Sequence, residues 1–413
     1  MRLLSGRAAA RAVGRLAERG TQYSALEPNV RRILNDVRRG GDRVLKRYAQ
    51  KWDGLRRQET VQVPDAELQA ASHFVPAHVS KSLRQAAANI RRFCEWQRPE
   101  SWMRQRNGIS LGQLVRPLES VGCYIPGGRH PLVSTLLMTV IPAQVAGVKN
   151  IRVTSPRPSH EVLAAAAMLG VTEFYRVGGA QAIAALAYGT DSVPRVDKIV
   201  GPGNSYVTMA KKLVSFDCAI DMLAGPTEAV VLSDSGTPAF IAADLVSQAE
   251  HDPDALSIFI TTSKTLARDV AGKISALIKQ NNIARQSLDR RGTILLASTR
   301  QQAREWANRI AAEHITIEKD DLPFIENAGS VFVGDYSPQA AGDYASGPNH
   351  VLPTSGQARF RGGLSVLDFV KVITVQELSA SGLKRIGKSV EYLAEIEGLA
   401  AHAHSIRARC ADA

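Results

Sequence analysis

The sequence of 413 residues is poor in cysteine and has no long hydrophobic run. Its four cysteines stand far apart and form no Cys-x-x-Cys motif. This spacing excludes a disulfide scaffold and a thiolate zinc ribbon, and it favours a reducing compartment. The longest apolar stretch, residues 136–148, is interrupted by polar residues and a proline. A membrane-spanning helix needs about 18–20 apolar residues, so we predict a cytoplasmic protein with no membrane partner.

Aromatic residues are also scarce, at 6% of the chain, although the formal net charge is +12. A strongly basic chain can bind nucleic acid. The densest basic region, residues 31–57, has few aromatic residues among its arginines and lysines, and the other charges are spread along the chain. We therefore interpret most of them as solvated helix faces. A non-catalytic nucleic-acid-binding protein is kept as the least favoured alternative.

The N-terminal segment MRLLSGRAAARAVGRLAERG is rich in arginine and has no acidic residue before Glu18. That composition resembles a transit peptide, but it equally suits a short amphipathic helix, which we favour. No hydrophobic core of a secretory signal follows it. Helical periodicity then continues through the first hundred residues, where Val30, Ile33, Leu34 and Val37 share one face.

From about residue 108 the pattern changes to short apolar runs that alternate with helical stretches. Strands are predicted at 121–125, 151–154, 174–177, 198–200, 229–232, 256–261, 293–297 and 330–333, with helices between most of them. Repeated βα units with turn residues at the junctions are typical of a parallel, doubly wound sheet. We therefore predict an α/β protein with two Rossmann-like halves and helical N- and C-terminal extensions.

The dinucleotide-binding motif G-x-G-x-x-G is absent, but three glycine loops stand where a predicted strand gives way to a helix. They are residues 127–128, 178–179 and 201–204. Backbone N–H groups at such a junction favour an anion, and ligands of open α/β sheets bind at the carboxyl ends of the strands. The alternative is that these glycines only permit tight turns.

The second half of the chain contains several His and acid clusters. Gln248 and His251 are spaced to share a helix face and could bind Zn²⁺ or Mn²⁺. Glu313 and His314 are adjacent and are the usual residue types of general acid–base catalysis. Each pair could instead be a polar helix end, where a histidine is favoured by the helix dipole.

Two further clusters lie toward the C-terminus. Asp343 and His350 flank a loop rich in glycine and proline, and Glu397 precedes His402 by five residues. Loops of this kind often carry binding residues. Because none of the clusters contains cysteine, the pattern indicates an open catalytic zinc site rather than a closed structural one.

The motifs together resemble the histidinol dehydrogenase family. The segments VGCYIPGG, GGAQAIAALAYGT, GPGNSYVTMAKKLV, IDMLAGPTE, ADLVSQAEHDPDA, AAEH, GDYASGPNHVLPTSGQARF and EGLAAHAHSIR occur in that family's order over nearly the whole chain. The resemblance implies a zinc enzyme that oxidises L-histidinol to L-histidine with two NAD molecules through a bound aldehyde. It also implies a homodimer in which C-terminal helices complete the partner's active site.

The resemblance also implies a role for particular residues. One zinc ion per subunit would be held by Gln248, His251, Asp343 and His402, which also face the substrate. His314 would be the general base of each oxidation, and Glu313 would activate the water that attacks the aldehyde. Further substrate contacts would come from Thr227, His350 and Glu397, and NAD contacts from Tyr124, Gln181 and Asn204.

The same resemblance divides the chain into parts. An N-terminal helical segment would span 1–24, and a Rossmann-like domain with the zinc and catalytic residues would combine 25–121 with 227–363. A second Rossmann-like domain, 122–226, would contact NAD, and a C-terminal helical segment, 364–413, would form the dimer.

Some positions depart from the family pattern. Thr227 stands where a serine is usual, Ala400 replaces a threonine, and the loop with Arg129 and His130 is short and basic. Similar proteins oxidise sulfonated diols with the same zinc and NAD chemistry, and such an enzyme is the principal alternative. Glu397 argues against it, because a carboxylate suits an imidazole and repels a sulfonate.

Overall fold

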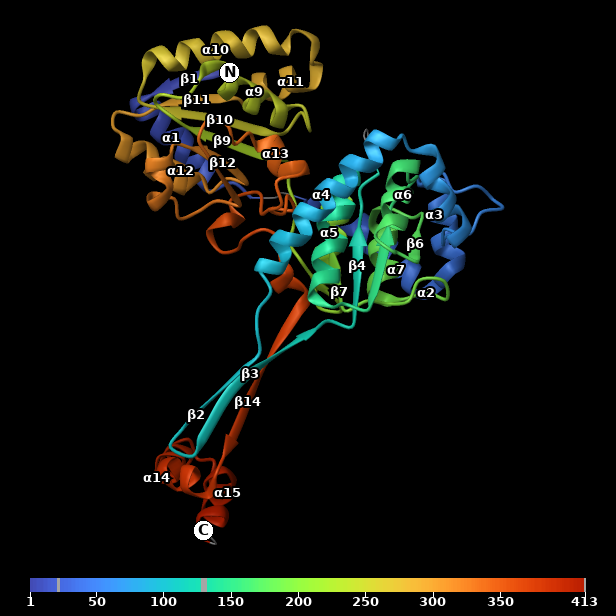
Figure 1. Cartoon of the computed structure of the whole chain (residues 1–413), viewed down its shortest axis with the longest axis vertical. Helices are drawn as coiled ribbons and strands as arrows, with labels where there is room; N and C mark the ends of the chain where they lie inside the picture. The colour runs from blue at the N-terminus through green and yellow to red at the C-terminus, as the bar shows by residue number, and fades with distance from the viewer. Residues whose placement is uncertain (21–22, 128–131, 412–413) are drawn as a thin grey trace.

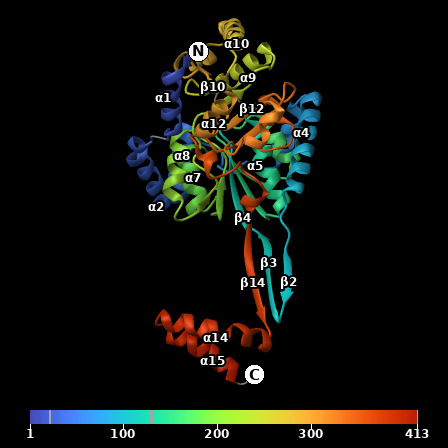
Figure 2. The ribbon, with the colours of Figure 1, turned by 90° about the vertical axis from the view of Figure 1, so that its left-hand side faces the viewer.

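The computed structural model describes residues 1–20, 23–127 and 132–411. Two α/β lobes lie side by side, and a long ribbon runs from them to a pair of C-terminal helices (Figures 1 and 2). Each lobe contains one parallel sheet covered by helices on both faces. The predicted class, two Rossmann-like halves with terminal extensions, is confirmed.

The first lobe is built on a six-stranded parallel sheet in the order β1-β11-β10-β9-β12-β13. Its strands are β1 (Arg2–Ser5), β9 (Glu228–Leu232), β10 (Leu256–Thr261), β11 (Thr293–Leu296), β12 (His314–Ile317) and β13 (Ser330–Val333). Its helices are α1 (Gly6–Ala17), α9 (Pro238–Ala249), α10 (Lys264–Leu277), α11 (Asn282–Arg290), α12 (Arg300–Ile310) and α13 (Gln339–Tyr344). Val230 packs with α1 and α12 on one face of the sheet, whereas Val231 packs with α9 and α10 on the other. This alternation follows from the two-residue period of a strand.

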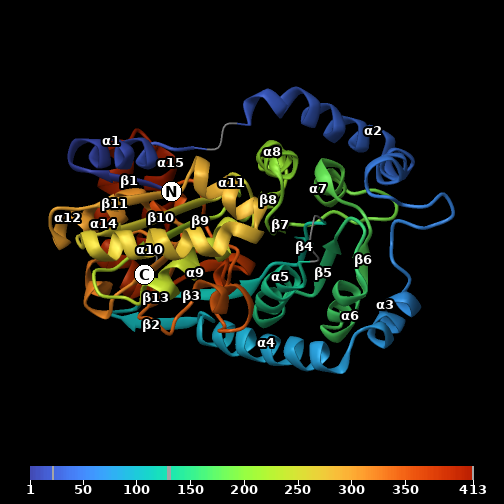
Figure 3. The same cartoon turned by 90° about the horizontal axis from the view of Figure 1, so that it is seen from above.

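The second lobe is built on a five-stranded parallel sheet in the order β6-β5-β4-β7-β8. Its strands are β4 (Ser120–Tyr124), β5 (Asn150–Thr154), β6 (Glu173–Tyr175), β7 (Lys198–Val200) and β8 (Ala219–Ile220). One face carries α3 (Asp65–Ala71), α4 (Ala77–Trp96), α5 (Val133–Ala146) and α6 (His160–Met168). The other carries α2 (Glu27–Trp52), α7 (Gly179–Tyr188) and α8 (Ser205–Val214), and Figure 3 shows α2 and α4 on opposite sides of this sheet.

The N-terminal region contributes to both lobes. Helices α2, α3 and α4 pack on the five-stranded sheet, and α4 also contacts the loop after α13, where Asn89 Nδ2 donates to the backbone oxygen of Ala345 at 2.9 Å. The chain begins in the other lobe, because β1 pairs in parallel with β11 at the edge of the six-stranded sheet. The periodicity of a helix shows that one face is buried but not which sheet buries it, so the exact division into domains remains a prediction.

The ribbon is a three-stranded antiparallel sheet of β2 (Trp102–Arg106), β3 (Ile109–Pro117) and β14 (Val370–Leu378). It leads to α14 (Ala380–Ile396) and α15 (Ala400–Ala411), which pack against each other far from both lobes (Figure 1). We call α14 and α15 the C-terminal hairpin. The remaining elements are 3₁₀ helices at Ser24–Leu26, Ser72–Phe74, Ile278–Gln280, Lys319–Phe324, Gln357–Arg359 and Val366–Phe369. Within the described ranges, no helix has the length and apolar character to cross a membrane.

Candidate functional site

The site forms where several elements of the six-stranded lobe end close together. Helix α12 ends at Ile310, and the left-handed backbone of the next residue, Ala311 (φ 50°), turns the chain sharply toward the start of β12. Glu313 and His314 follow this turn, and both are buried. Gln248 lies in the last turn of α9, and Asp343 lies on the short helix α13. Four residues from three separate segments are thereby brought together.

Asp343 links these residues through both oxygens of its carboxylate. Its Oδ2 accepts a hydrogen bond from Gln248 Nε2 at 2.8 Å, and its Oδ1 lies 3.1 Å from His314 Nε2. On the other side of the imidazole, Glu313 Oε2 lies 3.7 Å from His314 Nδ1. The imidazole therefore stands between two carboxylates, which is a suitable arrangement for accepting and releasing a proton.

His350 joins the same group from the loop that follows α13. Its Nδ1 lies 2.6 Å from the backbone oxygen of Asp343, and its Nε2 lies 3.3 Å from the hydroxyl of Thr135. Burial lowers the pKa of His350 although Asp343 opposes this effect. The ring is therefore favoured in its neutral form, with one nitrogen available as an acceptor.

The electrostatics of the acid–base pair follow from its burial. Burial raises the pKa of Glu313 to about 8, and the negative charges of Glu228 and Asp343 act in the same direction, whereas His314 and the hydrogen bond from the backbone N–H of Glu228 oppose them. Burial disfavours a charged His314, but Glu313 and Asp343 outweigh it and raise the pKa of the imidazole. Such perturbed carboxyl and imidazole groups in one place are typical of a functional site.

The predicted zinc ligands do not all meet in one chain. Gln248 and Asp343 are in contact. His402 lies on α15 in the C-terminal hairpin, and Glu397 ends α14 there (Figure 2). Both side chains are exposed. Across the described ranges, no three His, Cys, Asp or Glu residues of a single chain are placed to hold a metal ion.

The predicted NAD contacts lie at or after the carboxyl ends of strands in the five-stranded sheet. The buried Tyr124 ends β4, and its hydroxyl accepts a hydrogen bond from the N–H of Gly179 at 3.1 Å. Gln181 follows on α7 and is also buried, whereas Asn204 is exposed and caps α8. Asn204 accepts hydrogen bonds from two backbone N–H groups at the start of α8. The loop with Arg129 and His130 lies outside the described residues.

Sequence reasoning missed several residues that support these positions. Asp53, which ends α2, accepts hydrogen bonds from the N–H of Gly178 at 3.1 Å and from Gln181 Nε2 at 2.9 Å. Glu228, the neighbour of Thr227, forms a buried ion pair with Arg19 at 2.5 Å. No local motif marks Asp53 or Arg19, because their partners lie more than a hundred residues away.

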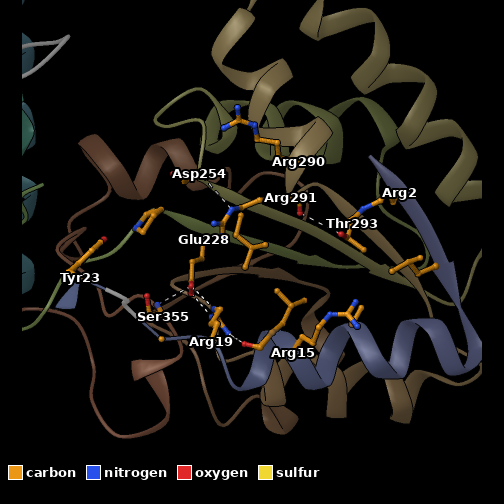
Figure 4. A pocket seen from close by; sticks show the side chains of 16 residues that line it. Arg2, Arg15, Arg19, Tyr23, Glu228, Asp254, Arg290, Arg291, Thr293 and Ser355 are labelled. Atoms are coloured by element: carbon orange, nitrogen blue, oxygen red, sulfur yellow. Dashed lines mark hydrogen bonds and ion pairs between the residues drawn. The ribbon is translucent and has the colours of Figure 1, made fainter. Parts of the chain in front are cut away.

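A cavity of about 500 Å³ adjoins this ion pair (Figure 4). Arginines, acids and apolar side chains line it, among them Arg19, Glu228 and Asp254. Gln248, Asp343, Glu313 and His314 are not among its lining residues. This cavity therefore lies beside the group of polar residues and does not contain it.

Comparison with known proteins gives a consistent result. Residues 16–410 match the model of the histidinol dehydrogenase family. The chain is 47% identical over 395 residues to histidinol dehydrogenase of Methanothermobacter thermautotrophicus, covering 92% of each chain. It is 45% identical to histidinol dehydrogenase of Aquifex aeolicus, covering 95% of each. The crystal structure of histidinol dehydrogenase from Elizabethkingia anophelis superposes with a TM-score of 0.95 at 35% identity, covering 100% of this chain and 98% of that one.

Proposed function

The chain belongs to the histidinol dehydrogenase family, a family of oxidoreductases of histidine biosynthesis, and we propose that it oxidises L-histidinol to L-histidine with zinc and two NAD molecules. The observation that carries this proposal is the arrangement around His314. A buried imidazole stands between Glu313 and Asp343, and Asp343 also contacts Gln248. The family name alone specifies neither the metal nor the cofactor, so both are parts of the proposal.

The residues present fit a zinc ion. Gln248, His251, Asp343 and His402 offer only nitrogen and oxygen donors, which suit a site that is open to substrate. Two of these side chains already lie together, although the Gln248 amide would have to turn its oxygen toward the ion. When bound, zinc would orient the substrate and act as a Lewis acid.

We propose that a second copy of the chain supplies His402 and Glu397. In one chain, the C-terminal hairpin lies away from both lobes (Figures 1 and 2). Large apolar side chains are exposed along the ribbon and the hairpin, including Trp102, Leu111, Ile373 and Ile396. Such a surface is typical of a protein interface, and an exchange of equivalent segments between two copies buries it symmetrically.

In the first oxidation, we propose that His314 accepts the hydroxyl proton of the substrate. The imidazole takes the proton from the hydroxyl group of histidinol while a hydride leaves the same carbon for NAD⁺. Asp343, at 3.1 Å from Nε2, holds the ring and stabilises the imidazolium that forms. The products of this step are the bound aldehyde and NADH.

In the second oxidation, we propose that Glu313 activates the attacking water. Its carboxylate takes a proton from water as the water oxygen adds to the aldehyde carbon, and the His314 imidazolium returns its proton to the aldehyde oxygen, which gives the hydrate and a neutral imidazole. The hydrate then gives a proton to His314 and a hydride to a second NAD⁺, which leaves the carboxyl group of histidine. Glu313 and His314 are adjacent in sequence, and their side chains meet at the 3.7 Å contact, so one site can serve both steps.

The ends of the substrate have separate partners in this proposal. Glu397 of the second copy and the neutral His350 would bind the imidazole, and Thr227 would contact the substrate from the segment that precedes β9. The NAD molecules would bind in turn near Tyr124, Gln181 and Asn204.

All four cysteines are free, which supports the cytoplasmic location expected from their spacing.

Metal content and activity test this assignment together. Purified protein should contain one zinc per subunit and form NADH from L-histidinol, and Gln248→Ala should lower both. A matched change at the exposed Gln301, which is remote in sequence from every proposed ligand, should lower neither. Full activity of a protein without bound metal would contradict the zinc assignment.

A further inference from the structure

A buried ion pair stands directly beside Glu313. Arg19 Nε donates to Glu228 Oε1 at 2.6 Å, and Arg19 Nη2 donates to Glu228 Oε2 at 2.5 Å (Figure 4). The side chains are 15% and 5% exposed, respectively. Two parallel hydrogen bonds from a guanidinium to a carboxylate give a fixed geometry as well as charge neutralisation.

Arg19 also holds the turn that leads to the acid–base pair. Its Nη1 donates to the backbone oxygen of Ile310 at 2.6 Å and to that of Leu16 at 2.5 Å. Its Nη2 lies 3.4 Å from the oxygen of Ala311. Ala311 has a left-handed backbone conformation, which is costly for a residue with a side chain. The guanidinium thus joins the end of α1 to the strained turn just before Glu313.

Glu228 contacts Glu313 itself. The backbone N–H of Glu228 donates to Glu313 Oε2 at 3.0 Å. The side chain of Glu228 is fixed by Arg19 and by the N–H of Ser355, which donates to Oε1 at 2.9 Å. One residue therefore connects the catalytic carboxyl group to Arg19, to β9 and to the loop that follows His350.

We propose that Arg19 and Glu228 are a positioning pair that holds the Glu313 carboxyl group in place to activate the attacking water in the second oxidation. The pair contacts Glu313 and the turn before it and need not touch substrate. This inference rests on the proposed function of Glu313. It also gives the N-terminal segment a function, because Arg19 lies just after the end of α1 in that segment.

The charges around Glu313 make the proposal testable by pH. The titratable groups that act on it are His314, Glu228 and Asp343, and Arg19 neutralises Glu228. Loss of Arg19 leaves the negative charge of Glu228 uncompensated beside Glu313, which disfavours a second carboxylate. Loss of the Glu228 charge has the opposite effect. A change that merely loosened the fold would not give shifts of opposite sign.

The experiment measures NADH formation from L-histidinaldehyde by the zinc-loaded enzyme as a function of pH. Arg19→Gln should lower kcat about tenfold because the carboxyl group is displaced. It should also shift the limb of the profile on which the rate rises with pH to higher pH. Glu228→Gln should shift that limb to lower pH. The double variant Arg19→Gln/Glu228→Gln should return the limb toward its original position while kcat stays low.

Matched controls separate this proposal from simpler explanations. Arg152→Gln breaks a partly buried ion pair of the other lobe, in which Arg152 lies 3.0 Å from Glu173, and it should leave the limb in place. Equal shifts of the pH limb in the same direction for Arg19→Gln and Glu228→Gln, or no shift in either, would overturn the positioning role. Glu313→Gln is run beside them. If that change leaves aldehyde oxidation intact, the proposed function of Glu313 fails, whatever the pair does.

Discussion

At the scale of single residues, Glu313 and His314 are adjacent but have different neighbours. Glu313 is bound by the N–H of Glu228, and His314 is bound by Asp343. His314→Asn should slow both oxidations by about 10²–10⁴-fold, because each needs the same proton acceptor. Stopped-flow measurement of NADH from histidinol and from the aldehyde separates the steps.

Glu313→Gln should behave differently from His314→Asn. The amide cannot take a proton from water, so the first NADH should form at nearly the normal rate and the second slowly, about 10²-fold or more below wild type. The bound aldehyde should then accumulate. Equal and mild effects of the two substitutions on both steps would contradict the division of roles.

Lys211 and Asp221 form a second buried ion pair, and it supports the loop that carries Asn204. Lys211 donates to Asp221 and, at 2.8 Å, to the backbone oxygen of Gly201, while Asp221 accepts from the N–H of Gly201 at 2.7 Å. Lys211→Met leaves a buried carboxylate without its cation and should cost about 3–5 kcal/mol of unfolding free energy.

Denaturant unfolding measures that loss. The control is Arg31→Gln, which breaks an exposed ion pair with Glu27 at 2.7 Å and should change the unfolding free energy by less than about 1 kcal/mol. Similar values for the two variants would show that the buried pair is not important for stability.

The residues of the site were visible in the sequence, but their contacts were not. The motif around Gln248 and the motif around Asp343 are 95 residues apart, and no pattern predicts the 2.8 Å hydrogen bond between them. Asp53 was missed because a single aspartate at a helix end has no distinguishing neighbours. Polar contacts between distant segments depend on the tertiary fold, which local periodicity does not describe.

At the scale of elements, the helices and strands with a buried face were predicted well. The strands at 198–200, 256–261 and 330–333 have the predicted bounds. Strand β12 was missed because it follows α12 almost directly, so that Glu313 and His314 resembled a helix end. The ribbon was also missed, since β2 is exposed along its whole length and shows no alternation between buried and exposed positions.

Helix α2 makes one contribution to the proposed NAD site that can be tested. Asp53 at its end holds Gly178 and Gln181 of the glycine loop. Asp53→Ala removes both hydrogen bonds and should raise the KM for NAD about 10- to 100-fold, since the loss of hydrogen bonds to a charged group costs about 1.5–3 kcal/mol, and it should change kcat little. The exposed Asp217→Asn is the control in steady-state kinetics. An unchanged KM for NAD in Asp53→Ala would contradict this role.

At the scale of the whole molecule, the ribbon places the C-terminal hairpin far from both lobes of its own chain (Figure 1). The class of fold was predicted from the sequence pattern, whereas a separate C-terminal segment was implied only by the resemblance to the family, because nothing local in the sequence describes the direction of an exposed ribbon. The proposed exchange between two copies makes a specific prediction for mixed dimers.

Two inactive variants should restore activity when they are mixed. His251→Asn damages the lobe, and His402→Asn damages the hairpin, so one of the two sites in a mixed dimer has neither change. After unfolding and refolding together, activity should recover to about one quarter of wild type, as random pairing of two-fold dimers requires. His251→Asn mixed with His314→Asn should recover none. No recovery in the first mixture would show that each chain completes its own site.

The central claim is a zinc-dependent oxidation in two steps at one site, and the stoichiometry of NADH tests it most directly. Purified protein is incubated with a limiting amount of L-histidinol and excess NAD⁺, and absorbance at 340 nm is followed to its end point. The account predicts about two NADH per histidinol, with activity lost on chelation and restored by added zinc. No NADH from histidinol by zinc-loaded protein, with turnover of a sulfonated diol instead, would contradict it.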